Sequence, residues 1–410
     1  MLVELLQFSE MAEFVASAAF PWPHLRLRRA GAACYEDAGG RPAAEPHTQT
    51  REALEENSVE RNAFSESWLM LAAEAHLIDD ERIHTLVSTD GADIVGLLPV
   101  RAPRGVLALP VATVWAHRHA FETTPPLRKG AAEAFFDDLF GWLGRHRIAV
   151  LRWPRLPLEG NVADMLTQYL RRTGRKFSIV AGHPRPLLDA QAVRSGQDQV
   201  ASHKRRRKVE RCRRRLMELG TLTFRSFDEL PDADQWAADF LRLEASGWKG
   251  ETGTRTALAC REPDRLFFLR VFKTAARKKR LLAYCLQLDG HPIAMAINFR
   301  SGEGVWAYKT AYDQRYARYG PGAMVEVDGT FAMLADPTIR WVDSCSDGDN
   351  ELLREIWPGR RRVGEMVIAV RPGSWAGVAS VFIFAELERA ARALLKKAYW
   401  GVKGRRSRNR

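Results

Sequence analysis

The sequence has few cysteines and no long apolar segment. Its five cysteines are widely separated along 410 residues and form no Cys-x-x-Cys pair, so we expect neither a disulfide framework nor a metal site. Isolated cysteines mostly act as small core residues. No stretch reaches the ~18 to 20 consecutive apolar residues of a membrane-spanning helix, and the N-terminus shows no basic segment followed by an apolar core and a cleavage site. These absences predict a cytoplasmic protein.

What the sequence has in excess is positive charge. Lys and Arg number 62 against 50 Asp and Glu, which gives a net charge of +12. Such a charge favours polyanionic partners, whether nucleic acid, acidic lipid headgroups, or a phosphate-bearing cofactor or substrate, and does not choose among them. The length and the hydrophobic content of 46% are sufficient for two domains with buried cores.

The first half of the chain alternates helix and strand patterns after an irregular beginning. Gly-Gly and Pro-containing turns interrupt short apolar runs in residues 1–60, which we interpret as an irregular N-terminal lead-in. Apolar periodicity over residues 61–185 predicts an N-terminal α/β half. Its predicted elements are a helix at 64–75, strands at 84–88, 93–101 and 106–115, a helix at 131–145, a strand at 148–153, a helix at 162–172 and a strand at 176–180.

The second half shows a similar order of elements. Residues 186–220 are predicted to form a linker and an Arg-rich helix, residues 221–372 a second domain, and residues 373–410 an amphipathic helix with a basic tail. The predicted elements are helices at 202–219, 232–246, 264–276, 323–334 and 350–356, and strands at 221–227, 280–288, 292–300, 304–311, 340–344 and 364–370. Two similar α/β halves in tandem follow from this order.

One loop combines glycine with positive charge. The predicted strand at 304–311 runs into Gly320-Pro321-Gly322, and a helix begins directly afterwards. Free backbone N–H groups and the positive end of a helix dipole would face an anion such as a pyrophosphate there. Arg315 and Arg318 add charge beside it. The alternative is an ordinary strand-to-helix turn that uses Gly and Pro for its geometry.

Several segments carry motifs in a fixed order along the chain. They are residues 202–220, 243–250, 292–294, 308–313, 319–322 and 343–357, and in the first half residues 62–64, 95–99 and Trp115. This ordered set resembles the CelD-type GNAT acetyltransferase family, whose relatives include the FemAB peptidoglycan transferases. The resemblance implies tandem GNAT-like domains of the α/β (α+β) class, with mixed, mostly antiparallel sheets flanked by helices. It also implies acetyl-CoA or another acyl-CoA as co-substrate, with no tightly bound cofactor.

Two positions depart from the family pattern. The GNAT loop usually reads Gln/Arg-x-x-Gly-x-Gly/Ala, whereas Ala317 stands at its first position and Arg318 follows one residue later. In the segment 343–357 the family usually has a lysine three residues before the tryptophan, here Trp357, whereas this sequence has Arg354, which keeps the charge but not a proton-transferring amine. Fem relatives use the same fold with aminoacyl-tRNA, so both donors stay open.

Acyl transfer requires a base for the proton of the acceptor and hydrogen-bond donors for the oxyanion. The predicted catalytic residues are Glu244, Lys249, Lys309, Asp313 and Asp343. The predicted donor-binding residues are Arg315, Arg318, Gly320, Gly322 and Ala323, and the predicted substrate-binding residues are Trp248, Tyr308, Tyr312 and Arg354. Any one of the charged residues could instead be structurally paired, and Trp248 could instead pack in the core.

Two basic segments could contact polyanions. The Arg-rich helix at 202–219 carries positive residues around its whole circumference, so we expect no one-sided buried face. It could clamp the phosphates of a nucleotide, a tRNA or a lipid-linked substrate, or simply be a solvated surface helix. The helix in the tail could lie on an anionic membrane surface or cap its own domain.

These features together predict an acyltransferase that moves an acyl group from acyl-CoA to an amine or hydroxyl of a cell-envelope polysaccharide or its precursor. A peripheral position at the inner membrane face is compatible with the basic segments. The alternatives are a Fem-like transferase that uses aminoacyl-tRNA and a catalytically inactive accessory protein of polysaccharide synthesis. The sequence does not determine the acyl group, the acceptor or the oligomeric state.

Overall fold

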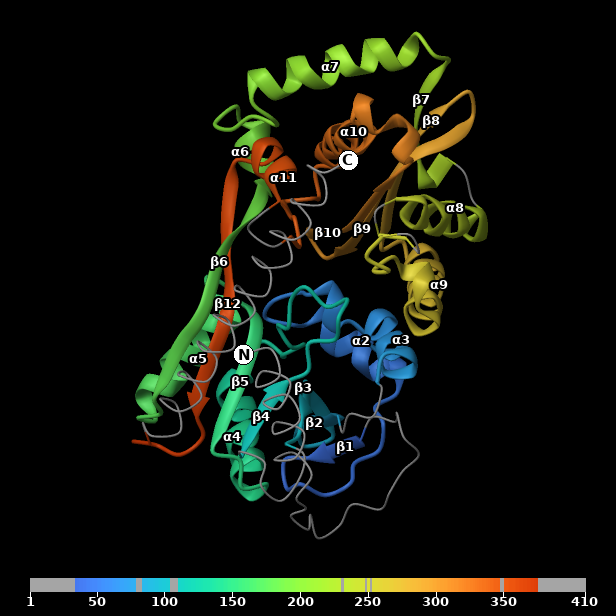
Figure 1. Cartoon of the computed structure of the whole chain (residues 1–410). Helices are drawn as coiled ribbons and strands as arrows, with labels where there is room; N and C mark the ends of the chain where they lie inside the picture. The colour runs from blue at the N-terminus through green and yellow to red at the C-terminus, as the bar shows by residue number, and fades with distance from the viewer. Residues whose placement is uncertain are drawn as a thin grey trace, which may run out of the picture.

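Twelve strands of the described chain join in one sheet with helices packed on both faces (Figure 1). The computed structural model describes residues 34–78, 83–103, 110–229, 232–247, 249–250, 253–346 and 350–374. Trp248, residues 1–33 and most of the predicted C-terminal helix and tail lie outside these ranges. Three of the strand pairs are parallel and eight are antiparallel, so the predicted mixed, mostly antiparallel α/β class is confirmed.

The N-terminal half follows the predicted alternation closely. In α5, for example, Val162, Leu166 and Leu170 are buried at four-residue spacing, the pattern that predicted this helix. The elements are β1 (Cys34–Asp37), α2 (Thr48–Glu56), α3 (Ser67–His76), β2 (Ile83–Asp90), β3 (Asp93–Arg101), β4 (Val111–Val114), α4 (Ala132–Arg145), β5 (Val150–Pro157), α5 (Asn161–Arg172) and β6 (Phe177–Asp189).

The C-terminal half follows a short helix, α6 (Ala190–Arg194), and repeats the order of the first. Its elements are α7 (His203–Met217), β7 (Leu222–Ser226), α8 (Ala233–Ser246), α9 (Glu262–Arg277), β8 (Leu281–Leu288), β9 (His291–Ser301), β10 (Gly304–Tyr312), the 3-10 helix η4 (Gln314–Tyr319), α10 (Pro321–Ala335), β11 (Trp341–Asp343), α11 (Glu351–Ile356) and β12 (Gly359–Ala369).

The order of strands shows that the two halves are equivalent. Across the sheet the order is β1-β2-β3-β4-β5-β12-β6-β11-β10-β9-β8-β7. Counted inward from the two opposite edges, each strand of the first half occupies the same position as the strand six places later in the chain. The parallel pair β4–β5 matches the parallel pair β10–β11. The edges differ, because β1 runs parallel to β2 whereas β7 runs antiparallel to β8. The predicted tandem arrangement of two similar halves is thus visible in the topology.

At the centre of the sheet the two halves exchange a strand. β6, the last strand of the first half, pairs with β11 of the second, and β12 pairs with β5 of the first. The two exchanged strands also pair with each other from Gly359–Leu187 to Ile368–Phe177. The predicted boundary near residue 185 therefore falls inside β6, because a strand that crosses between halves carries no local sequence mark.

Part of the predicted irregular lead-in is regular structure. β1 extends the sheet beside β2, and α2 buries Arg51, Leu54 and Glu55. The prediction for residues 1–60 is wrong over these two elements. The strand is only four residues long and lies between turn-forming residues, so its sequence gave no period-2 signal.

The Arg-rich helix α7 has a narrow buried face, contrary to the sequence-based expectation. Val209 and Leu216 are buried and Cys212 is half-buried, at spacings that place all three on one side of the helix. Figure 1 shows α7 passing over α10, and Arg213 donates to Asp328 of α10 at 2.7 Å. Arg205 is half-buried and pairs with Glu355, whereas most of the other basic residues are exposed. The apolar stripe packs in the same core cluster as residues of α10, and the Arg213–Asp328 pair adds a polar contact.

Candidate active site

β10 and β11 separate shortly after they pair. The parallel contact joins only Gly304–Trp306 to Trp341–Asp343, after which β10 continues to Tyr312. β10 is also irregular toward β9, because the register shifts between Ala307 and Lys309. The separation and the bulge occur at the same point in the strand. Bulges of this kind re-aim side chains and are common beside active sites.

The bulge places two consecutive side chains on the same face of the sheet. Tyr308 packs in the core shared with α8 and α9, and Lys309 reaches Glu244 of α8. Thr310, the next residue, points to the opposite face and donates to Glu326 of α10. In a regular strand Tyr308 and Lys309 would lie on opposite faces. The bulge therefore creates a cluster that strand alternation would not produce.

Three of the five predicted catalytic residues meet in this cluster. The Nζ atoms of Lys309 and Lys249 lie 3.1 and 3.9 Å from Oε1 of Glu244. Glu244 is 3% exposed, and its other oxygen accepts a hydrogen bond from the backbone of Leu258 at 2.8 Å. Burial and the neighbouring charge of Lys309 lower the pKa of Lys249, while Glu244 opposes this. One carboxylate thus holds two amines close together.

Tyr308, predicted to bind substrate, lies beside the cluster. Its side chain is 5% exposed, and no described residue forms a hydrogen bond with its hydroxyl. Burial, followed by the charges of Glu244 and Asp264, raises the pKa of Tyr308 well above its usual value. The Nζ atom of Lys309 lies 5.9 Å from the ring centre. A neutral hydroxyl without a partner is a ready hydrogen-bond donor.

The first half contributes residues that the sequence analysis missed. The connection between β4 and α4 crosses to the second half, where the rings of His119 and Phe121 lie 6.2 and 6.0 Å from Tyr308. Nε2 of His119 lies 2.7 Å from Oδ1 of Asp264, near the start of α9. Asp264 also accepts from Arg118. A contact between residues 145 positions apart leaves no trace in local periodicity.

The glycine loop lies next to this cluster but its charges are largely paired. Asp313 accepts from the backbone of Arg315 and pairs with its guanidinium at 2.6 Å, and these contacts lower the pKa of Asp313. Gly320 adopts a left-handed conformation with φ 62°, and α10 begins at the next residue. A Cβ atom on Gly322 would lie 3.0 Å from the ring of Tyr312. The backbone is therefore held closely where a donor's phosphates are predicted.

Arginines flank the start of α10. Arg318 lies over the ring of Tyr319 at 4.7 Å and donates to its hydroxyl at 2.6 Å, and Arg215 of α7 approaches the same ring at 5.8 Å. Arg315 is exposed, with 78% of its side chain accessible. Ala323 lies in the first turn of α10 and is half-buried. The predicted donor-binding residues therefore lie on one short segment that is open to solvent on the Arg315 side.

The remaining predicted residues lie elsewhere. Asp343 is fully buried at the centre of the sheet, where it pairs with Arg185 at 3.3 Å and Arg361 at 3.4 Å. This environment is that of a structural carboxylate at the junction of the halves. Arg354 is exposed on α11. Trp248 lies outside the described residues, so its predicted role stays untested.

A groove beside the loop is large enough for a cofactor. It has a volume of about 850 Å³ and is lined by α8, the β8–β9 hairpin and the start of η4, including Arg242, His291, Asp313, Arg315 and Tyr316. α8 connects this groove to the cluster, because Arg242 lines the groove and Glu244 holds the two lysines. Small-molecule sites commonly have volumes of about 300 to 1,000 Å³.

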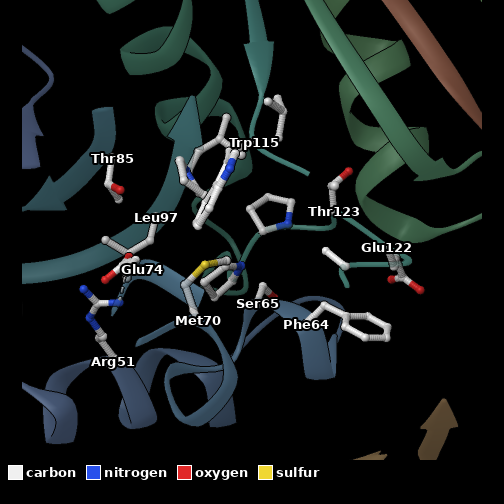
Figure 2. A pocket seen from close by; sticks show the side chains of 16 residues that line it. Arg51, Phe64, Ser65, Met70, Glu74, Thr85, Leu97, Trp115, Glu122 and Thr123 are labelled. Atoms are coloured by element: carbon white, nitrogen blue, oxygen red, sulfur yellow. Dashed lines mark ion pairs between the residues drawn. The ribbon is translucent and has the colours of Figure 1, made fainter. Parts of the chain in front are cut away.

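The first half has a much smaller cavity, which lies between α3 and β3. Figure 2 shows Met70, Leu97 and Trp115 around it, with Arg51 and Glu74 pointing toward one another at 3.9 Å. Its volume is about 30 Å³, close to the space of a single water molecule. Of these two spaces, only the groove of the second half could hold an acyl donor.

Two further observations bear on the sequence-based expectations. Among the described residues, no group of three or more His, Cys, Asp or Glu side chains is arranged to hold a metal ion. In the same part of the chain no helix combines the length and the apolar character needed to cross a membrane.

Comparison with known proteins agrees with this geometry. Residues 203–350 match the family described as acetyltransferase (GNAT) domain. The match covers α7 through β11 and thus includes the bulge, the glycine loop and the cluster around Glu244. The second half therefore contains an acyltransferase domain of the GNAT type, while the narrower CelD-type resemblance stays a prediction.

Solved structures show the same fold over most of the chain. L-PGS from Bacillus licheniformis is 14% identical, with a TM-score of 0.51, and the match covers 83% of this chain and 96% of that one. FemX is 10% identical, with a TM-score of 0.51, and the match covers 79% of this chain and 96% of that one. At such identities the likeness establishes the fold and not the substrate. No curated protein matches the sequence.

Proposed function

We propose that the protein transfers an acetyl or other acyl group from acyl-CoA to an amine or hydroxyl of a cell-envelope polysaccharide or its precursor. The observation that carries the proposal is the open groove, which lies beside the glycine loop and shares α8 with the buried Glu244 cluster. A donor in the groove would contact Asp313, Arg315 and Tyr316, which lead from the end of β10 into the glycine loop. The groove itself is not lined by Gly320, Gly322 or the residues of the Glu244 cluster, so the donor would have to extend from the groove to reach them.

The loop offers complementary charge to the donor's phosphates. Gly320 turns the chain into α10 through a left-handed conformation, and the start of α10 supplies the positive end of a helix dipole. Arg315, whose side chain is exposed, is positioned to exchange part of its contact with Asp313 for a phosphate. Such charge-assisted hydrogen bonds are among the stronger polar contacts.

The cluster offers groups for the acyl end of the reaction. The unpaired hydroxyl of Tyr308 and the amine of Lys309 are hydrogen-bond donors on one face of β10. Either could stabilise the oxyanion that forms when the acceptor attacks the thioester carbonyl. The buried surroundings strengthen these interactions because the local dielectric is low.

The test combines coenzyme binding with transfer. We expect acetyl-CoA to raise the melting temperature of the intact protein, and radiolabelled acetyl-CoA to label amino-sugar or polysaccharide acceptors. Gly322→Val should abolish the thermal shift, because its side chain would enter the space beside Tyr312, whereas Gly144→Ala, with nothing within 4 Å, should not. Absence of both binding and transfer in the wild-type protein would refute the proposal. Binding without transfer to any acceptor would favour an accessory role.

A second candidate, an aminoacyl-tRNA-dependent transferase, is favoured by the outer surface of α7. Seven of its basic residues are exposed, namely Lys204, Arg206, Arg207, Lys208, Arg211, Arg214 and Arg215. Phosphate contacts of this kind bind nucleic acid in a strongly salt-dependent manner. Retention of charged tRNA at low salt, lost on replacing Arg207, Arg211 and Arg214 with Gln, would support it. A thermal shift with coenzyme A and no tRNA retention would exclude it.

A further inference from the structure

We propose that His119, held by Asp264, accepts the proton of the attacking amine or hydroxyl, so that the first half of the chain supplies the base for the site of the second. The inference deepens the proposed acyl transfer and rests on it. Its basis is the position of the β4–α4 connection against Tyr308 and α9.

The two equivalent connections of the tandem halves have diverged. In the second half, residues 313–320 link β10 to α10 through the glycine loop. In the first half, residues 115–131 link β4 to α4, and this longer connection packs into the core shared by α3, α8 and α9. It has no Gly-Pro-Gly turn. The connection that would form a donor loop in the first half instead lines the site of the second.

His119 is fixed on two sides. Its ring stacks on Phe267 of α9 at 5.1 Å with an interplanar angle of 10°. Nε2 lies 2.7 Å from Oδ1 of Asp264, so Nε2 carries the hydrogen and donates to the carboxylate. Nδ1, the other ring nitrogen, then carries the lone pair that can accept a proton. A base oriented by a carboxylate is the arrangement used to activate nucleophiles on many folds.

The surrounding charges favour an unprotonated ring. Burial lowers the pKa of His119, Lys309 of β10 and Arg118 of its own loop lower it further, and Asp264 of α9 opposes them. His117, two residues earlier, is buried, and its pKa is well below the usual value. Tyr308, the other neighbour from β10, is uncharged. The ring is therefore neutral near pH 7 and available to accept a proton.

The lone pair of the acceptor nitrogen or oxygen attacks the thioester carbonyl, a bond to carbon forms, and the proton of the nucleophile passes to Nδ1 of His119. Collapse of the tetrahedral intermediate breaks the carbon–sulfur bond. The departing thiolate takes back one proton, so that no oxidant, reductant or metal is required.

A purely structural role for His119 is the competing explanation, since the stack on Phe267 also anchors the connection. The pH dependence of kcat separates the two. If His119 is the base, kcat of the wild-type protein should fall on the acid side (the acid limb), below about pH 6.5, which is the usual pKa of histidine. His119→Gln should remove this limb and lower kcat by about 10²-fold or more, the range of general-base catalysis. Asp264→Asn should shift the limb to lower pH, because Asp264 supports the protonated form.

Control measurements keep the test decisive. His76→Gln, a histidine at the end of α3, should leave kcat and the profile unchanged. If His119→Gln keeps kcat within threefold of wild type with the same acid limb, the inference is overturned while the acyl transfer stands. If the wild-type protein transfers no acyl group, both the proposed acyl transfer and the role of His119 are refuted.

A second measurement does not require activity or a substitution. Nitrogen NMR of the histidine rings should assign the Nε2–H tautomer to His119 and a pKa below 6.5. An Nδ1–H tautomer, or titration above pH 7, would overturn the inference even in an active protein.

Discussion

Arg361 holds together the buried charges between the two halves, and its removal should destabilise the whole fold. Its guanidinium lies 3.0 Å from Glu60, 3.1 Å from Glu122 and 3.4 Å from Asp343. Among the described residues, Arg185 is the other cation paired with this group, through Asp343 at 3.3 Å. Arg361→Met would leave three carboxylates with one guanidinium. Leaving a buried charge uncompensated costs about 3–5 kcal/mol, and we expect a loss of this size in the free energy of unfolding.

The loss in the free energy of unfolding caused by Arg361→Met should depend on pH. Burial and the charge of Glu122 already raise the pKa of Glu60, and loss of the guanidinium would raise it further. A carboxyl whose pKa is raised by folding destabilises the folded state once pH exceeds its unfolded value, and more so up to its folded value. The difference between Arg361→Met and wild type should therefore be large at pH 8 and smaller at pH 5, where the variant can bind protons.

Urea unfolding followed by circular dichroism and tryptophan fluorescence at both pH values measures these differences. Arg362→Met, an exposed neighbour on the same strand, should change stability by less than about 0.5 kcal/mol. Adding Glu122→Gln to Arg361→Met should recover part of the loss, since it removes one uncompensated charge. A cost below about 1 kcal/mol for Arg361→Met, or one equal at pH 5 and pH 8, would refute the reasoning.

Three further predictions concern stability. Burial raises the pKa of Glu326 to about 6, so Glu326→Gln should stabilise the fold at pH 8 by up to about 2 kcal/mol and give no gain near pH 4; an equal effect at both values in urea titrations would contradict this. Gly304→Ala should cost about 1–3 kcal/mol, because its Cβ would lie 2.2 Å from the ring of Trp341; an unchanged melting temperature would argue against the packing. Burial opposes ionisation of Glu36, but hydrogen bonds from two histidines and a tryptophan lower its pKa to about 2. Its contribution to stability should be complete above pH 4.5 and disappear as pH falls toward 2, so Glu36→Gln and wild type should differ at pH 7 and converge in acid.

The order of elements could be predicted from the sequence because helix and strand periodicities are local. Most predicted helices and strands coincide with observed ones to within a few residues, including α4, α8, β9 and β10. The glycine loop could also be predicted from local sequence, because Gly320 and Gly322 indicate a turn before a helix whatever the tertiary fold. Glu244, Lys249 and Lys309 were proposed as members of one site, and the fold does bring them together.

Other features depend on contacts between distant parts of the chain. The exchange of β6 and β12 follows from pairing between strands about 180 residues apart, and neither strand differs locally from one that stays in its own half. The bulge that places Tyr308 beside Lys309 depends on the register with β9, which no residue of β10 determines alone.

The sequence by itself determined the α/β class of this protein, the tandem order of its elements and the position of the glycine loop, where we propose that a donor's phosphates bind. The tertiary structure decided which charged residues act together. In the folded chain Asp343 lies in a buried network between the halves, and Asp313 pairs with Arg315. His119 of the first half contacts Asp264 of the second. The physical reason is that secondary structure reflects neighbours in sequence, whereas an active site is formed by packing residues that the chain separates.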